Sequence, residues 1–336
     1  MDARDGKSVA GEADRGARRA DVVLEGGGVK GVGLLGALCE LADRGWGLER
    51  IAGTSAGAIV GALAAGYTAA GRPLSDIIEV MNSLDYGSLR DGTTLDRLGA
   101  PGKALQLLLS EGIYKGDAAA EWIRTELAAV GVHTWADLRI ADPDTSLEPY
   151  QQYRLVIMAS DLSRGQLVRL PWDYRHYGLD PDEQPVAAAV RASMSIPFFF
   201  RPVTLKTGSR GGGDVTLVDG GMLSNFPVET FDRTDGRPAR WPTFGVKLSA
   251  RAASRQRARH IDGPFDLALA CLHTLLQAHD AYHLEDTGAT RRTMFVDTEG
   301  VSSVDFDIDP PTRERLFANG RKAARTFLEG IGSCDT

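Results

Sequence analysis

The chain has 336 residues, of which 43% are hydrophobic and 25% are charged, a composition typical of a globular protein with one large α/β domain or two smaller ones. Its formal net charge of −7 counts against a nucleic-acid binder, because contacts to phosphates need a basic face. The longest weakly polar stretch, residues 58–71, is too short to span a bilayer, which takes about 20 apolar residues.

Residues 1–20 alternate charged residues with glycine and alanine and contain no apolar segment of the signal-peptide kind. We predict that they form a disordered tail. The three cysteines are widely spaced and include no C-x-x-C pair, which favours a reducing compartment and no zinc ribbon. Cys39 falls in an apolar helical pattern and is expected in the core. The sequence therefore predicts a cytoplasmic protein.

A strand–helix–strand–helix unit follows the tail. Residues 21–25 form an apolar run, and apolar residues at helical spacing then continue through 32–41 until Gly45. Residues 48–53 predict a second strand, and 56–65 a second helix rich in small residues. This order is typical of the right-handed crossover that joins neighbouring parallel strands. We therefore expect an α/β fold with a mostly parallel sheet.

The loop after the first strand matches G-x-G-x-x-G through Gly26, Gly28 and Gly31. Such a loop presents backbone N–H groups to an anion, either a nucleotide phosphate or the oxyanion of an ester under attack. A dinucleotide fold needs an acidic residue at the end of the second strand, where this chain has GTSAG. A phosphate-binding P-loop also fails, because Lys30 precedes Gly31 and Val32 follows it.

The second strand ends in a G-x-S-x-G motif, whose strand-to-helix context is that of a nucleophile elbow. Its members are Gly53, Thr54, Ser55, Ala56 and Gly57. An equally compatible interpretation is an ordinary turn in which Thr54 or Ser55 caps the following helix.

The two motifs together indicate a shared site, because adjacent parallel strands place both loops at the carboxyl edge of the sheet. Ser55 is then expected to touch the glycine loop. A serine nucleophile beside free N–H groups has what acyl transfer requires, an attacking oxygen and a site for the developing negative charge. Lys30 either adds positive potential there or is a solvated surface lysine.

The segment at 71–140 predicts helices inserted over the sheet, at 103–111 and 118–131. Residues 98–115 set a leucine-rich helix next to glycine breaks, as in a mobile lid, although a helix packed permanently on the core fits equally well. The apolar run at 195–200 either lines an acyl-chain site or belongs to the core. Later strands are expected at 153–162, 166–170, 215–220 and 243–249, and later helices at 263–285 and 312–329.

A serine nucleophile needs a base. The downstream histidines are His260, His273, His279 and His283, and none sits in a glycine-flanked loop at a strand end. We interpret them as core or helix-end residues, with a metal pair at His279 and His283 as a remote alternative.

Asp219 ends an apolar strand, and Gly220 and Gly221 let the backbone turn past it. Taken alone, an Asp-Gly turn is the more common explanation of this pattern. A role as base requires partial burial of Asp219 and hydrogen-bond contact with Ser55.

Three motifs in this order resemble the patatin-like phospholipase family: GGGVKG at 26–31, GTSAG at 53–57 and DGG at 219–221, with RASMSIPFFFRPV just before the last. The resemblance covers 21–231. It implies a three-layer α/β/α fold and lipid acyl hydrolysis by a Ser–Asp dyad without a catalytic histidine.

Carried onto this chain, the resemblance makes Ser55 the nucleophile and Asp219 the base, with Gly27 and Gly28 at the head of the oxyanion loop. DGG in place of the family's frequent DGA is a small departure, which we do not expect to abolish activity.

The expected protein is a cytoplasmic serine acyl hydrolase of the phospholipase A or lysophospholipase type. Residues 232–336 are expected to complete the same domain. Its partners would be a phospholipid or other acyl-ester lipid and, transiently, a membrane surface, with no nucleic acid, metal or organic cofactor. The alternatives are a catalytically idle lipid-binding or scaffold protein and a dinucleotide-dependent oxidoreductase. The sequence sets no expectation for the oligomeric state.

Overall fold

The structure is a computed structural model that describes residues 18–84, 112–142, 144–209, 212–248, 287–303, 305 and 307–332, together with positions 261, 263, 267, 270 and 274. Several predicted features lie outside these residues: 1–17 of the tail, 98–111 of the possible lid, most of the helix at 263–285, and the four histidines His260, His273, His279 and His283.

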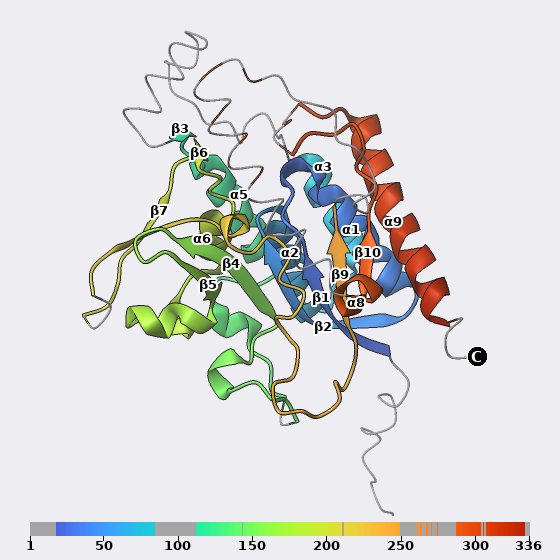
Figure 1. Cartoon of the computed structure of the whole chain (residues 1–336), viewed down its shortest axis with the longest axis horizontal. Coiled ribbons are helices and arrows are strands. Elements are labelled where there is room, and N and C mark those ends of the chain that lie inside the picture. The colour runs from blue at the N-terminus through green and yellow to red at the C-terminus, as the bar shows by residue number, and fades with distance from the viewer. Residues whose placement is uncertain are drawn as a thin grey trace, which may run out of the picture.

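A mostly parallel sheet forms the centre of the molecule (Figure 1). Its strand order is β10 (Thr293–Phe295), β9 (Thr243–Lys247), β1 (Arg18–Leu24), β2 (Trp46–Thr54), β4 (Leu155–Asp161), β8 (Val215–Asp219) and β7 (Val203–Leu205), while β5 (Gln166–Leu170) pairs with β4 off this path. Strands from β10 to β4 run parallel to their neighbours, whereas β8 and β5 are antiparallel to β4. A separate parallel pair joins β3 (Gly112–Tyr114) to β6 (Phe198–Phe200).

The predicted crossover unit builds the middle of this sheet. Strand β1 is followed by α1 (Gly31–Asp43), β2 and α2 (Ala56–Ala69), and β1 pairs with β2 in parallel. Val22, Val23 and Leu24 are fully buried, as is typical of a parallel strand covered on both faces. Small residues bring α2 close to the sheet, since a Cβ at Gly61 would lie 3.1 Å from Ile51.

The first strand begins at Arg18, so the predicted boundary of the tail at residue 20 is wrong. Arg18, Arg19 and Ala20 pair with Trp46, Gly47 and Leu48 of β2. Ala20 is buried, while the exposed Arg18 lies with its guanidinium 5.7 Å from the centroid of the Trp46 ring. A charged strand end is tolerated because its charged groups reach solvent. The charged sequence pattern therefore concealed the start of the strand.

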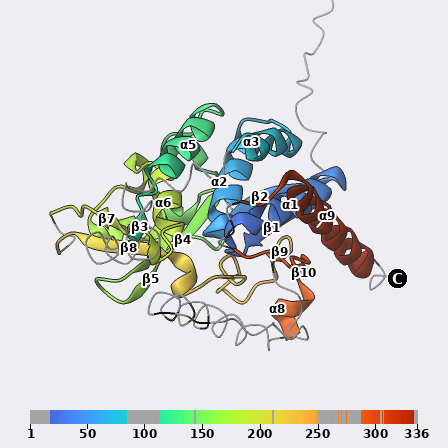
Figure 2. The same cartoon turned by 90° about the horizontal axis from the view of Figure 1, so that it is seen from above.

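Helices lie on both faces of the sheet, which confirms the predicted three-layer α/β/α arrangement. Figure 2 shows α2, α3 (Ile77–Ser83) and α5 (Asp117–Ala128) on one side and α8 (Thr287–Arg291) on the other. Helix α6 (Val186–Ser193) packs against α5, and α9 (Pro310–Gly332) lies along α1. At the crossing of α1 and α9, a side chain at Gly36 or Gly320 would collide with the backbone of the other helix.

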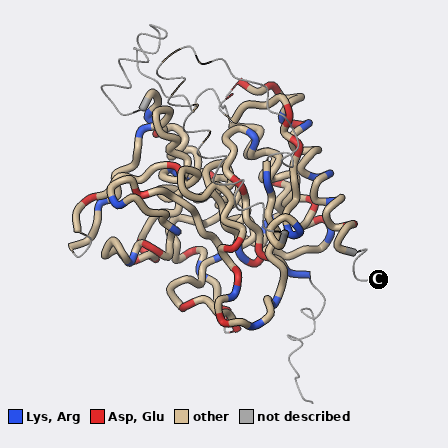
Figure 3. Tube along the Cα trace, viewed as in Figure 1, with Lys and Arg blue, Asp and Glu red and all other residues tan. Residues whose placement is uncertain are grey.

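Charges of both signs are interspersed along the described trace (Figure 3). Many of them pair, as at the interface of α1 and α9, where the buried Glu40 lies 2.8 Å from Arg321 and its pKa is lowered, mainly by a hydrogen bond from Arg325. Among the described helices, none combines the length and apolar character needed to cross a bilayer.

Candidate active site

Ser55 lies on a sharp turn between the last residue of β2 and the first residue of α2. Its φ of 52° and ψ of −116° are rare for a residue that carries a side chain. A Cβ at Gly57 would collide with the carbonyl of Leu24, and one at Gly53 with the carbonyl of Gly57. The glycines of the G-x-S-x-G motif are therefore required for the turn to close against β1.

Ser55 occupies the N-cap position of α2, as the alternative interpretation allowed, but its side chain makes no capping hydrogen bond. The N–H of Ser55 donates to Ser193 Oγ at 2.9 Å, and the Thr54 hydroxyl donates to the carbonyl of Ser224 at 3.1 Å. Only 6% of Ser55 is exposed. The turn is thus held from two sides, and its hydroxyl stays available for chemistry in a sheltered site.

The glycine loop touches this turn, as the pairing of the two motifs predicted. The N–H of Gly26 donates to the carbonyl of Asn225 at 3.1 Å, and the Gly26 carbonyl accepts from Asn225 Nδ2 at 3.3 Å. A Cβ at Gly26 would lie 3.1 Å from Cβ of Ser55. At the start of α1, a Cβ at Gly31 would lie 3.3 Å from the side chain of Ala56.

Two N–H groups of the loop, those of Gly27 and Gly28, have no hydrogen-bond acceptor within the described ranges. Gly28 has a φ of +57°, and a side chain there would collide with the carbonyl of Ser303, so only glycine fits. The loop is anchored beyond this point, because Val29 N–H donates to Ser303 at 3.1 Å and Lys30 N–H donates to Gly27 at 3.3 Å. The Lys30 residue is half-buried. Among the described residues, the N–H groups of Gly27 and Gly28 are thus candidates for binding an anion.

Asp219 approaches Ser55 across β4. It is the last residue of β8, which runs antiparallel to β4 with Asp219 opposite Ala159. On the other side of β4, Thr54 lies opposite Met158. The ends of β2 and β8 thus come level on the two flanks of one strand, each about 4.8 Å from it.

Burial raises the pKa of Asp219 to about 6, while hydrogen bonding from the Ser55 hydroxyl and from Gly221 N–H opposes the rise. The N–H of Gly221 donates to Asp219 Oδ1 at 2.8 Å. The other oxygen, Oδ2, has no partner at ordinary hydrogen-bond geometry among the described residues, so the serine contact is loose. Such contacts often tighten only when substrate binds. A carboxylate that titrates near neutrality beside a serine can serve as its base.

The two glycines after Asp219 have different tasks. A Cβ at Gly220 would collide with the carbonyl of Met158, so this position has no room for a side chain. Gly221 supplies its backbone N–H to the carboxylate, which an alanine would also provide. This difference explains how DGG can replace DGA.

The residues that hold both catalytic candidates in place were not assigned from the sequence. Ser193 accepts from the elbow, and the carbonyl of Ser195 accepts from Asp219 N–H at 3.0 Å. The buried Arg191 donates to Ser195 Oγ and to the carbonyls of Lys115 and Arg201. The RASMSIP pattern marks these residues in the sequence, but it does not indicate which residues they contact.

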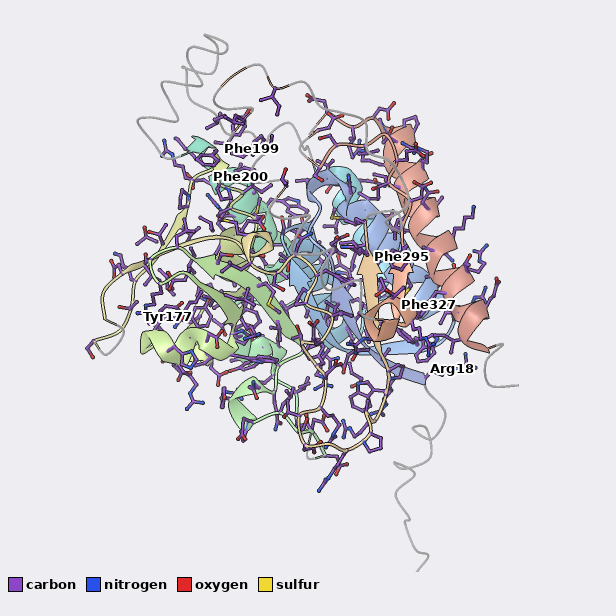
Figure 4. All side chains as sticks on the ribbon, viewed as in Figure 1. Arg18, Tyr177, Phe199, Phe200, Phe295 and Phe327 are labelled. Atoms are coloured by element: carbon purple, nitrogen blue, oxygen red, sulfur yellow. The ribbon has the colours of Figure 1, made fainter. Side chains whose placement is uncertain are left out.

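An apolar cavity of about 50 Å³ opens beside Ser55. Its walls include Ser55, Ile59, Met81, Met194, Ile196 and Phe200. The run at 195–200 therefore contributes two residues to the cavity. Figure 4 labels Phe200 next to Phe199, and their ring centroids lie 5.0 Å apart.

Two roomier cavities have linings of mixed polarity and do not include Ser55. One, of about 370 Å³, lies beside the middle of β1 and β2 and the start of β9, where Arg50 pairs with Asp21 and lies over the ring of Phe231. The other, of about 480 Å³, surrounds Trp172 and His176. The candidate active site is therefore distinguished by its apolar lining beside Ser55 and not by its volume.

On this fold, a serine at the end of β2 with an apolar cavity at its side is the arrangement of a lipid hydrolase. The chain belongs to the patatin-like phospholipase family, whose model matches residues 22–232. It is 37% identical over 314 residues to the uncharacterized protein YqhO of Bacillus subtilis (strain 168). This match covers 92% of this chain and 98% of YqhO. The crystal structure of VipD from Legionella pneumophila shares the fold, with a TM-score of 0.50 and 18% identity over 93% of this chain and 67% of that one.

Proposed function

We propose that this protein hydrolyses fatty-acyl esters of membrane glycerophospholipids, as a phospholipase A or lysophospholipase. One observation carries the proposal: Ser55 faces the carboxyl of Asp219 and is itself part of the wall of the apolar cavity. A fatty-acyl ester suits this arrangement, because its methylenes leave water while its carbonyl meets the nucleophile. Each buried methylene contributes about 0.8 kcal/mol to binding.

The first half-reaction forms an acyl-enzyme. Ionised Asp219 takes the proton of the Ser55 hydroxyl as Oγ attacks the ester carbonyl carbon. The carbonyl oxygen becomes an oxyanion, which the N–H groups of Gly27 and Gly28 stabilise, with Lys30 adding positive potential. The C–O bond to the alcohol then breaks, and protonated Asp219 returns the proton to the leaving lysophospholipid or glycerol oxygen.

The second half-reaction releases the fatty acid. Asp219 takes a proton from a water molecule that attacks the acyl carbon on Ser55, and the same two N–H groups stabilise the second oxyanion. Collapse of this intermediate breaks the bond to Oγ, and the proton on Asp219 passes to the serine. The fatty acid leaves, and the site is restored.

The cavity takes the first carbons of the acyl chain. A longer chain requires its walls to yield, and Met81 and Met194 are suited to this because methionine side chains are flexible. Phe198, two residues from Phe200 on β6, is 38% exposed and has a φ of 69°. Bulky residues rarely adopt this strained conformation, and such strain clusters at functional sites. We therefore assign Phe198 a transient contact with the membrane surface, and we place the protein in the cytoplasm.

The test is lipid mass spectrometry after incubation of the pure protein with vesicles of mixed phospholipids. Released fatty acid is expected from the wild type, with equimolar lysophospholipid if it is a phospholipase A or with glycerophosphodiester if it also cleaves lysophospholipid. No product is expected from Ser55→Ala, which removes the nucleophile while the fold stays intact. A serine-reactive phosphonate should label Ser55 alone. Vesicle binding without product and without labelling would instead support the catalytically idle lipid-binding alternative.

A further inference from the structure

Glu25 lies where β1 ends and the glycine loop begins, and it forms an ion pair that is almost completely buried. Glu25 is 4% exposed and Lys247 is 2% exposed. The carboxylate accepts hydrogen bonds from Lys247 Nζ and from the N–H of Leu248. Replacing a buried ion pair by apolar residues is often neutral or stabilising, so this pair is weak as a source of stability. Neither member takes part in the chemistry proposed for Ser55 and Asp219.

The hydrogen bonds around Glu25 depart from a regular parallel ladder. Leu24 lies opposite Val246, and Glu25 N–H donates to the Val246 carbonyl at 3.1 Å. In a regular ladder the Glu25 carbonyl would next accept the N–H of Leu248. That N–H instead donates to the Glu25 carboxylate. The Glu25 carbonyl is near the elbow, where a Cβ at Gly57 would lie 2.8 Å from it.

We propose that Glu25 is a positioning residue for the oxyanion loop: its side chain takes the place of its own backbone carbonyl in the ladder with β9. This substitution lets the chain leave β1 and bring Gly27 and Gly28 to Ser55 without an unpaired N–H in the core. The contact beyond it is tight, since a Cβ at Gly27 would lie 2.5 Å from Leu248 Cδ1. The position of the two N–H donors therefore depends on the carboxylate of Glu25.

The acceptor and the charge of this pair are separable. The acceptor role of the Glu25 carboxylate concerns the N–H of Leu248. The carbonyl of Leu248 is held separately, because it accepts a hydrogen bond from the Thr298 hydroxyl at 2.6 Å. The charge role belongs to Lys247, whose ammonium neutralises the carboxylate and lies 5.1 Å from the centroid of the Phe226 ring. Glutamine at position 25 would keep an acceptor oxygen and lose the charge, leucine would lose both, and methionine at position 247 would remove the matching cation.

Two double variants, E25Q/K247M and E25L/K247M, test the inference, which rests on the proposed esterase activity. Both lack the ion pair, and only the first keeps an acceptor for Leu248 N–H. For E25L/K247M we expect kcat on a short-chain ester to fall by about 10²- to 10³-fold, as when an oxyanion donor is lost. KM should stay within a few-fold, because the apolar cavity is untouched, and the midpoint of the pH profile should remain near 6 because Asp219 is unchanged. E25Q/K247M should recover most of kcat.

Hydrogen exchange of the peptide covering 25–31 gives a readout that needs no activity. Its amides should exchange faster in E25L/K247M than in the wild type or in E25Q/K247M. Equal kcat and equal exchange in the two double variants would overturn the inference. An inactive wild type would overturn the proposed function, while the exchange rates would still decide the role of Glu25. If E25L/K247M fails to fold by circular dichroism, E25M/K247M takes its place under the same criteria.

Discussion

Replacing Asp219 by asparagine should stabilise the protein while it removes the activity. Burial raises the pKa of this carboxyl from 3.8 to about 6. Because the pKa is higher in the folded than in the unfolded state, the folded protein binds the proton more tightly. The resulting stability is fully present below pH 3.8 and is lost as the pH rises through 6. A rise of about 2 in pKa corresponds to about 3 kcal/mol, so ionised Asp219 lowers the free energy of unfolding by about that amount.

The D219N variant lacks this pH dependence, and its side-chain oxygen can still accept from Gly221 N–H. Between pH 4.5 and 8, the free energy of unfolding of D219N should therefore rise relative to the wild type by about 2 kcal/mol. Urea unfolding of both proteins at the two pH values measures this difference. Ester hydrolysis should fall by about 10²- to 10⁴-fold, the usual effect of losing a general base.

An exposed carboxylate provides the control. The pKa of Asp235 is lowered to about 2, chiefly by a hydrogen bond from Arg233, so D235N should show no such relative gain of stability with rising pH. A difference between D219N and the wild type that is equal at pH 4.5 and 8 would refute a raised pKa for Asp219. Wild-type turnover by D219N would remove it as the base.

Three further predictions follow from the same geometry. The kcat/KM of the wild type should increase with pH along a titration curve whose midpoint is near pH 6, because the base must be ionised. At pH 5 its value should be about a tenth of the plateau. A flat profile from pH 5 to 8 would contradict this. Gly28→Ala should reduce kcat by about 10²- to 10³-fold, since its Cβ would collide with backbone beside the oxyanion donors. Gly45→Ala is the control: Gly45 also has a positive φ, of +78°, but open space surrounds it, so this variant should keep wild-type kinetics. Phe198→Gly relieves backbone strain of about 1–3 kcal/mol and should leave thermal stability equal or higher, yet it should slow hydrolysis of vesicles several-fold without affecting a dispersed short-chain ester. Leu162→Ala, at a residue 48% exposed, is the matched surface control, and equal losses on both substrates would argue against a membrane contact.

The elbow and the glycine loop could be predicted from sequence because their causes are local. Gly57 must lack a side chain to pass the carbonyl of Leu24, and Gly28 must adopt a positive φ. Such requirements leave a pattern in neighbouring residues. The order of the first two strands was also accessible, because a right-handed crossover makes them parallel neighbours. The start of β1 was missed, since the charged Arg18 and Arg19 pair within the sheet but have no apolar signature.

The place of Asp219 depended on tertiary structure. In a parallel sheet, the carboxyl ends of all strands lie at the edge where ligands bind. This rule does not place the carboxyl end of β8, because β8 is antiparallel to β4. Asp219 reaches Ser55 because β8 ends opposite Ala159, level with the end of β2. Nothing in VTLVDGG specifies that register.

The supporting contacts were equally beyond sequence reasoning. Ser193 holds the elbow from 138 residues away, Asn225 holds Gly26 from 199 residues away, and Lys247 pairs with Glu25 over 222 residues. The local sequence determines which turns the chain can make, because φ and steric contact act between neighbours in the chain. Which side chains meet across the sheet is decided by strand order and register, since these bring together hydrogen-bonding groups that no local pattern connects.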